Sequence, residues 1–172
     1  HPGSATIKLA SEDPPPIVTL TALTATASEA GTIPGRFRIR RADQVSVPLT
    51  VYLTRTGTAT PGTDYPAFPL TVTIPAKAYF TDILITPVND ILPEGPETIT
   101  LALKANTAYT RGTPSSATVT ITSDDPRPTI TVTASRPTAS EAGLATGKLT
   151  FTRTGSTAYA LTVAYTVTGT AT

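Results

Sequence analysis

The chain has 172 residues and a net charge of only +1, and it contains no cysteine, methionine or tryptophan. The near-neutral charge argues against a nucleic-acid-binding protein, and the lack of cysteine excludes disulfides and thiolate metal sites. No stretch approaches the roughly 18 apolar residues of a membrane-spanning helix, so we expect no membrane insertion.

Alternation of threonine with apolar residues predicts short β-strands along the whole chain. Threonine, which is β-branched and favours strands, occurs 38 times. Segments such as TVTI at 71–74 and TVTIT at 118–122 place every second side chain on one face. Glycine and proline clusters, for example LPEGPE at 92–97, interrupt these runs. The pattern indicates an all-β, seven-stranded antiparallel sandwich. Its strands are expected near residues 17–23, 35–41, 47–54, 69–74, 79–88, 97–105 and 115–122.

The sequence repeats itself with a period of 112 residues. Residues 4–60 align with residues 116–172 without a gap, and 27 of the 57 aligned positions are identical. The string TASEAG occurs at 26–31 and again at 138–143. A match of this length predicts tandem modules. We assign residues 1–13 to the last strand of a preceding module, 14–125 to a complete module and 126–172 to the first half of a following one.

Two interpretations of the incomplete modules are open. The chain is either part of a longer tandem array, which is the simpler interpretation, or a subunit whose open ends are completed by its neighbours. Open sheet edges favour strand addition from another chain.

Three arginines alternate along the predicted strand at 35–41. Arg36, Arg38 and Arg40 would share one face of this strand, with Phe37 and Ile39 on the other. We interpret the arginines as a solvent-exposed face, because the second copy of the repeat does not keep them. The six tyrosines form no visible aromatic stripe and are expected at core edges and turns.

The acidic residues are concentrated at predicted strand ends. Ten of the 12 follow this pattern, and the two that do not are Asp43 and Asp82. Alternate connections of a sandwich lie at the same end, so these acids would gather there, and Ca²⁺ takes 6–8 oxygen ligands from such groups. Alternatively, acids simply populate turns and cap backbone amides, as Asp64 after Gly62 would. The ten are Glu29, Asp64, Asp90, Glu94, Glu97, Asp124 and Asp125, with the repeat-related Glu12, Asp13 and Glu141.

Three segments resemble the Calx-beta domain. They are GTATPGTDY at 57–65, VNDILPEGPETITLAL at 88–103 and SSATVTITSDD at 115–125. This module is named for sodium–calcium exchangers and also occurs in an integrin and in bacterial surface proteins. The resemblance implies a seven-stranded immunoglobulin-like β-sandwich.

The resemblance also implies a calcium site. Its ligands would be an early glutamate, the aspartate of the DY turn, the acidic turn before the sixth strand and a terminal acidic run. This chain has Asn-Asp-Ile at 89–91 and Ser-Asp-Asp at 123–125 where strong binders resemble three consecutive aspartates. We therefore expect one or two Ca²⁺ sites of modest affinity, about 10⁻⁴–10⁻³ M. The implied ligands are Glu29, Asp64, Asn89, Asp90, Glu94, Glu97, Asp124 and Asp125, and Glu141 is expected to lack its partners.

The residues argue against an enzyme. The one histidine is His1, and there is no cysteine nucleophile, nucleophile-elbow motif or phosphate-binding loop. We interpret the chain as an extracellular or cell-surface structural or adhesive spacer, stiffened by calcium at the join between modules. The alternative is a filament subunit assembled by strand complementation, and a less favoured one is a calcium-sensing regulatory domain. The expected partners are neighbouring modules or identical subunits, followed by cell-surface proteins or glycans.

Overall fold

The computed structural model describes residues 14–43 and 46–170. The predicted last strand at 1–13, with Glu12 and Asp13, lies outside the described residues. Contacts divide the chain into two compact units, one with residues 14–89 and 95–123 and the other with residues 90–94 and 124–170. Within the described part, no helix is long and apolar enough to cross a membrane.

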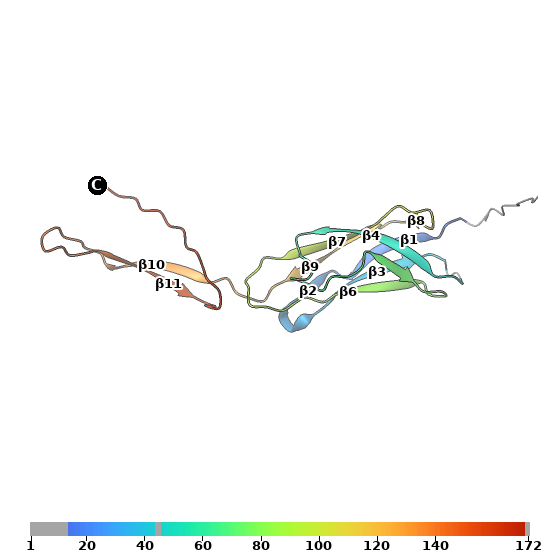
Figure 1. The fold of residues 1–172 in the computed structure, drawn as a ribbon, viewed down its shortest axis with the longest axis horizontal. Helices are drawn as coiled ribbons and strands as arrows, with labels where there is room; N and C mark the ends of the chain where they lie inside the picture. The colour runs from blue at the N-terminus through green and yellow to red at the C-terminus, as the bar shows by residue number, and fades with distance from the viewer. Residues whose placement is uncertain (1–13, 44–45, 171–172) are drawn as a thin grey trace, which may run out of the picture. The chain divides into compact units, whose positions relative to one another are not determined.

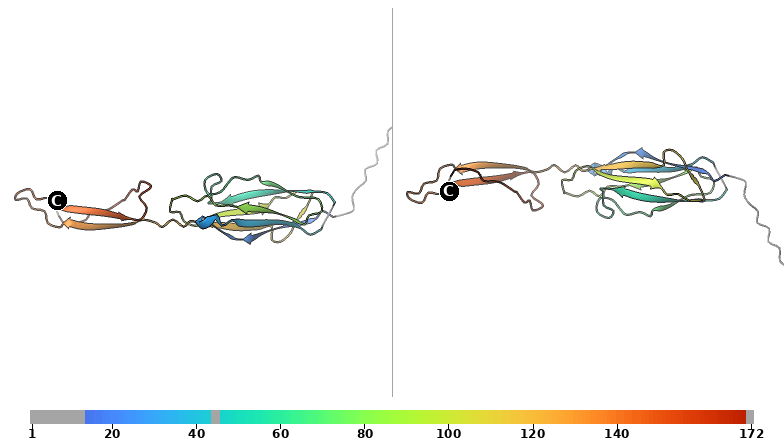
Figure 2. Two further views of the ribbon diagram at one scale, coloured as in Figure 1. Left: turned by 90° about the horizontal axis from the view of Figure 1, so that it is seen from below. Right: turned by 90° about the horizontal axis from the view of Figure 1, so that it is seen from above.

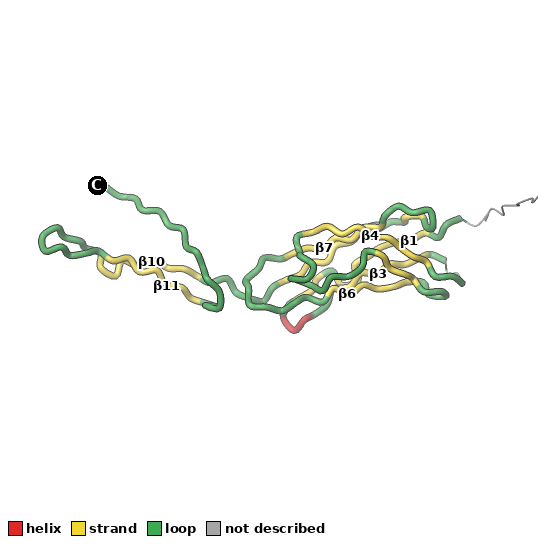
Figure 3. Tube along the Cα trace, viewed as in Figure 1, coloured by secondary structure: helices red, strands yellow, loops and turns green. Residues whose placement is uncertain are grey.

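The first unit is built almost entirely of strands, and its one helical element is a single 3-10 turn, η1 (Ala30–Thr32), red in Figure 3. Each of the seven predicted segments holds a strand, but two further short strands, β2 and β8, lie outside these segments, so the count differs from the prediction. The strands are β1 Ile17–Thr24, β2 Thr26–Ser28, β3 Gly35–Arg41, β4 Leu49–Gly57, β5 Thr71–Ile74, β6 Phe80–Ile85, β7 Glu97–Leu103, β8 Thr110–Arg111 and β9 Ser116–Thr122.

These strands form two sheets that pack as a sandwich (Figures 1 and 2), which confirms the predicted fold class. One sheet has the order β6-β3-β1-β8 and the other β2-β9-β7-β4-β5. The pairings are antiparallel except for β1 with β8 and β2 with β9. The chain changes sheets between β1 and β2, directly after an irregularity at Ala22–Thr24, where a bulge bends the strand. This crossing carries the TASEAG turn to the end of the second sheet.

The core follows the predicted alternation. Along β3, Phe37 and Ile39 are fully buried, while Arg36 and Arg40 are exposed and Arg38 is half-buried. The arginine face is therefore solvent-exposed, as expected, because alternate side chains of a strand point to opposite faces.

Arg41 ends the same strand on its inward face and is fully buried, which the sequence interpretation missed. Its guanidinium donates from Nε to the carbonyl of Ala78 at 2.8 Å, from Nη1 to that of Val47 at 3.1 Å and from Nη2 to that of Pro75 at 3.0 Å. One buried cation therefore joins the end of β3 to two loops through three backbone carbonyls.

Two tyrosines are buried anchors, as expected. The Tyr109 hydroxyl donates to the carbonyl of Lys104 at 2.7 Å and accepts from the backbone N–H of Tyr52 at 3.2 Å. Tyr109 is only 3% exposed, and Tyr65 is 1% exposed. Each tyrosine thus fixes a connection to the apolar core.

Asp82 on β6 is the partner of Arg38, one of the three alternating arginines of β3. It accepts two hydrogen bonds from Arg38, from Nε at 2.8 Å and from Nη2 at 2.9 Å. The hydrogen bonds and charge of Arg38 hold the pKa of the Asp82 carboxyl below its ordinary value, against the opposing effect of burial. A lowered folded-state pKa means that the pair stabilises the fold above the unfolded-state pKa of about 4, and that this contribution is lost as pH falls through the folded-state value.

We therefore expect Asp82→Asn to be less stable than the wild type near neutral pH and to converge with it below about pH 4. Urea unfolding of both proteins across this range measures the difference. A stability difference that stays constant down to the most acidic condition would show that the carboxylate charge is not its source.

The second unit contains a single hairpin, in which β10 (Thr129–Arg136) pairs antiparallel with β11 (Lys148–Thr154). Within the described residues of this unit no third strand joins it. Residues 161–169 form no strand, although six of their nine residues are identical to those of β4.

Candidate metal centre

Glu29, in the first TASEAG turn, is held at the end of β2 by backbone hydrogen bonds. Its N–H donates to the carbonyl of Thr122 at 3.1 Å, and its own carbonyl accepts from the N–H of Thr32 at 2.9 Å. A bridge between Ser28 and Ile33 closes the turn. The Glu29 side chain is only 2% exposed. The sequence therefore folds here so that a carboxylate is buried beside the end of β9.

Asp64 is the second buried acid, and its own turn holds it. The Oδ2 atom of Asp64 accepts a hydrogen bond from the N–H of Thr60, and the Asp64 carbonyl accepts from the N–H of Val88 at 2.9 Å. Asp64 is 6% exposed. The Thr60 amide is a contact that sequence reasoning missed, although the GTAT string just before the turn points to its place.

Tyr65 fixes this turn to the core. Its ring centroid lies 6.0 Å from that of Phe68, and the guanidinium carbon of Arg55 lies 5.9 Å from the Tyr65 ring centroid. Burial raises the pKa of the Tyr65 hydroxyl, the neighbouring Asp64 adds to this, and Arg55 opposes it. Tyr65 therefore stays neutral near pH 7 and anchors the residue before it.

Strand register places the Glu29 turn and the terminal acids at one end of the five-stranded sheet, and the end of β4, which leads into the Asp64 turn, pairs with β7 at the same end. Ser28 pairs with Thr122, and Glu97, the first residue of β7, pairs with Ile121. Glu29 directly follows Ser28, and Asp124 lies two residues beyond Thr122. The pairing of Ser28 with Thr122 therefore aligns Glu29 with Asp124. The expected gathering of acids at one end is found for these residues.

The carboxylates form two groups of three. One comprises Glu29, Asp124 and Asp125, and the other Asp64, Glu94 and Glu97, and in each group one oxygen from every residue lies within 4.8 Å of the others. Glu94 lies three residues before the start of β7, and Asp124 lies two residues beyond the end of β9. Short covalent connections to strands of the sandwich therefore determine where these acids lie.

Asp90 lies in neither group of carboxylates, and Asn89, which would offer an amide oxygen, carries no carboxylate. Asn89 is exposed, and Asp90 is half-buried with its Oδ1 accepting the N–H of Leu92 at 2.6 Å. This is the turn-capping role expected of an isolated aspartate in a loop. Their assignment as ligands stays a prediction.

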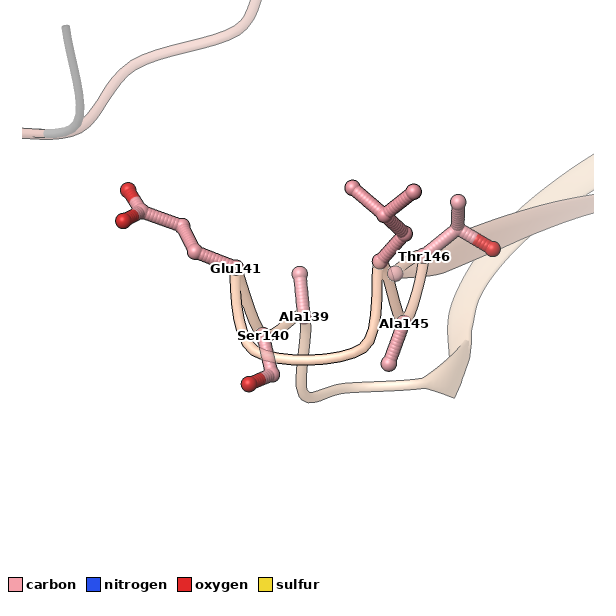
Figure 4. A pocket seen from close by; sticks show the side chains of 7 residues that line it. Ala139, Ser140, Glu141, Ala145 and Thr146 are labelled. Atoms are coloured by element: carbon pink, nitrogen blue, oxygen red, sulfur yellow. The ribbon is translucent and has the colours of Figure 1, made fainter.

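Glu141 occupies the same turn in the second TASEAG copy but has different surroundings. The bridge between Ser140 and Ala145 repeats that between Ser28 and Ile33. Glu141 is exposed and lies in neither acidic group of the described residues. Figure 4 shows its carboxylate extending away from Ala139, Ala145 and Thr146, which line the same shallow hollow.

The two acidic groups have the chemistry of a hard-cation site. Two carboxylates about 4 Å apart repel by about 1 to 4 kcal/mol, depending on how far water screens them. A divalent cation replaces this repulsion with attraction, and oxygen-only groups suit Ca²⁺. The residues present therefore fit calcium.

Comparisons with known proteins agree with this architecture. The sequence model of the Calx-beta domain matches residues 11–125. Among solved structures, CBD12 from CALX1.2 matches with a TM-score of 0.51 and 22% identity, over 62% of this chain and 45% of that one. The calcium binding domain CBD12 of CALX1.1 matches with a TM-score of 0.51 and 23% identity, over 62% of this chain and 44% of that one. The apo form of the Calx CBD1 domain matches with a TM-score of 0.51 and 22% identity, over 63% of this chain and 98% of that one.

These structural matches show the fold, and the first two cover less than half of the chains they align with. No curated protein matches the sequence. The family match includes both buried acids and all six members of the acidic groups. It also covers more than half of the 172 residues, and the protein therefore belongs to the Calx-beta domain family.

Proposed function

We propose that this protein is a non-enzymatic, calcium-binding Calx-beta module that acts as an extracellular structural or adhesive spacer. The observation that carries the proposal is the pair of three-carboxylate groups at one end of the five-stranded sheet. Membership of the family adds support, since one similar structure is described as a calcium binding domain.

Burial makes the argument stronger than a count of acids. Glu29 and Asp64 are the most buried members of their groups, at 2% and 6% exposed. Burying a carboxylate is costly unless hydrogen bonds or a cation compensate. Three carboxylates offer up to six oxygens, which with water meets the coordination number that Ca²⁺ requires. We therefore propose one or two bound ions, at most one for each group.

The spacer role rests on where the acids lie in the sequence. Asp124 and Asp125 are followed at once by Pro126, with Pro128 two residues later. Proline stiffens a connection, and a cation held by the preceding acids restricts it further. An affinity of about 10⁻⁴–10⁻³ M suits an extracellular location, where calcium is plentiful. Neighbouring modules or identical subunits are the proposed partners, with cell-surface proteins or glycans next.

Calcium titration of the full chain tests the proposal. We expect binding heat in calorimetry and a gain in unfolding free energy of about 1.4–2.7 kcal/mol when calcium exceeds Kd by about 10- to 100-fold. Glu29→Gln and Asp64→Asn keep shape but remove charge, and each is expected to weaken binding by about tenfold or more. Glu141→Gln is the matched control, because the same hexapeptide holds an exposed glutamate there.

Two results would contradict the proposal. One is the absence of both heat and a melting shift at calcium concentrations of about 10 mM. The other is an equal loss of affinity in Glu141→Gln and Glu29→Gln, which would show that the buried group is not the site.

A further inference from the structure

The outward face of β1, β3 and β6 in the four-stranded sheet is organised in cross-strand rows. Each of the three alternating arginines of β3 lies opposite a threonine of β1 on one side and a residue of β6 on the other. The two outer rows hold Thr19, Arg40 and Phe80 in one and Thr24, Arg36 and Leu84 in the other. Since the β6 residues of these two rows are exposed, each outer guanidinium stands between a hydroxyl and an exposed apolar side chain.

The central row contains the one carboxylate at the outward positions of these strands. Arg38 donates two hydrogen bonds to Asp82, and its guanidinium carbon lies 3.6 Å from the centroid of the Phe80 ring. Arg36 Nη1 lies 3.9 Å from the same carboxylate, which is too long for a hydrogen bond. Arg40 is exposed and forms no ion pair with any residue that the structure describes. Three guanidinium groups thus face one carboxylate, which leaves two positive charges in excess.

The second copy of the repeat shows that the hairpin does not need these arginines. Their equivalents on β11 are Lys148, Thr150 and Thr152. β11 nevertheless pairs with β10 in the register that β3 keeps with β1, for example Thr152 with Thr131 where Arg40 pairs with Thr19. Threonine supports the same strand pairing, so strand formation does not account for the arginines of β3.

The excess charges lie too far apart for one small anion. Successive outward positions of a strand are about 6.8 Å apart, so Arg36 and Arg40 are about 14 Å apart along β3. A ligand that neutralises both is therefore an extended chain with several anionic groups. Arg38 and Asp82 show on this same face that a guanidinium holds a carboxylate through two hydrogen bonds, from Nε and Nη2, which is the strong fork geometry.

Three features select the class of chain. β3 lies between β1 and β6, so it offers no strand edge to which an extended peptide could add. The net charge of +1 does not favour a nucleic acid. Sugar rings combine hydroxyl edges with apolar C–H faces, which suit the threonine hydroxyls on one side of each outer arginine and Phe80 or Leu84 on the other. A chain of carboxylated sugars fits all three features.

We propose that the outward face of β1, β3 and β6 binds a linear polysaccharide of uronic acids. Arg36 and Arg40 hold the carboxylates of separate sugars, and Phe80 and Leu84 contact the apolar faces of the rings. The flanking threonines of β1 exchange hydrogen bonds with sugar hydroxyls. This inference names a glycan partner for the proposed adhesive role and rests on that role for its biological setting, but binding at this face requires no calcium.

Calorimetric titration of the full 172-residue chain with an oligogalacturonate, in calcium-free buffer, tests the proposal. We expect saturable binding that is about tenfold weaker at about 200 mM salt than at about 50 mM, as counterion release predicts for two charged contacts. Amide shifts in the isotope-labelled chain should concentrate in β1, β3 and β6. The methyl-esterified oligosaccharide, which has the same sugars without the charges, should not bind. Because calcium is absent, failure here is distinct from failure of the calcium titration.

Variants of the chain isolate the charged contacts. Arg36→Gln and Arg40→Gln are each expected to weaken binding by about 3- to 10-fold, because charge-assisted hydrogen bonds at an exposed site are lost. Arg136→Gln, which removes the same charge from β10, should change affinity by less than about twofold. Asp82→Asn releases Arg38 and should strengthen binding by about 3- to 10-fold, with a salt dependence steeper by roughly one contact. A gain in affinity cannot come from unfolding, so this variant guards against a merely structural effect.

Four outcomes would overturn the proposal. They are no binding of the oligogalacturonate, equal binding of its methyl ester, equal effects of Arg40→Gln and Arg136→Gln, and weaker binding by folded Asp82→Asn. Binding of polyglutamate with the same affinity would assign the face to acidic peptides and would also contradict it.

Discussion

Replacing Arg41 with leucine is expected to lower the free energy of unfolding by about 3–5 kcal/mol, the largest effect of any single polar substitution we foresee here. The guanidinium is fully buried and donates to three backbone carbonyls, those of Val47, Pro75 and Ala78. Leucine fills part of the volume but leaves these acceptors without a donor. A hydrogen bond to a charged group contributes about 1.5–3 kcal/mol, so the loss of all three accounts for this magnitude.

Arg40→Leu is the matched control for this prediction. It makes the same chemical change one residue earlier on β3, where the side chain is exposed. We expect a change within about 0.5 kcal/mol. Urea unfolding of both variants and the wild type measures the contrast. Similar losses in the two variants would mean that arginine content, and not the buried network, stabilises this region.

Gly57→Ala is expected to cost about 3–4 kcal/mol or to prevent folding. Gly57 ends β4 with φ of +134°, a conformation that L-residues rarely adopt, and it pairs with Ile99. A Cβ atom built there lies 2.0 Å from the carbonyl oxygen of Thr98, a backbone atom that also accepts a hydrogen bond from the N–H of Ala59 at 3.1 Å. The substitution therefore combines backbone strain with a steric clash.

Gly62→Ala separates these two causes. Gly62 also has a positive φ, of +90°, but no atom lies within 4 Å of the Cβ position. Its expected cost is about 1–2 kcal/mol, from backbone strain alone. Thermal unfolding of both variants gives the comparison. If Gly62→Ala is as destabilising as Gly57→Ala, the close approach to Thr98 is not the decisive factor.

Much of the fold could be predicted because it depends on local patterns. Alternation along β3 correctly placed Phe37 and Ile39 inside and Arg36 and Arg40 outside. The same alternation puts Arg41 on the inward face, yet a charged residue is expected outside. Its burial depends on carbonyls of the loops around Val47 and Pro75, which only the folded chain brings together.

The candidate site was predictable in its residue types but not in its grouping. Six of the seven predicted carboxylate ligands fall into two groups, while Asp90 does not, and Asn89 carries no carboxylate. Sequence spacing cannot assign Glu29 to the terminal acids and Asp64 to Glu94 and Glu97. The register of β2, β7 and β9 aligns Glu29 with the terminal acids, and the pairing of the end of β4 with the start of β7 brings the Asp64 turn to Glu97.

A comparison of the two copies of the repeat distinguishes what the sequence determined from what the tertiary structure decided. The sequence by itself determined the all-β class, the strand positions and the TASEAG turn, which closes in the same way in both copies. It did not decide burial, since Glu29 is 2% exposed and Glu141 is exposed in the identical hexapeptide.

Nor did sequence alone decide strand formation. Residues 49–57 form β4, but residues 161–169, identical at six of nine positions, form no strand. The physical reason is that a strand completes its backbone hydrogen bonds only through its neighbours. β4 lies between β5 and β7, whereas within the described residues 161–169 no strand lies alongside.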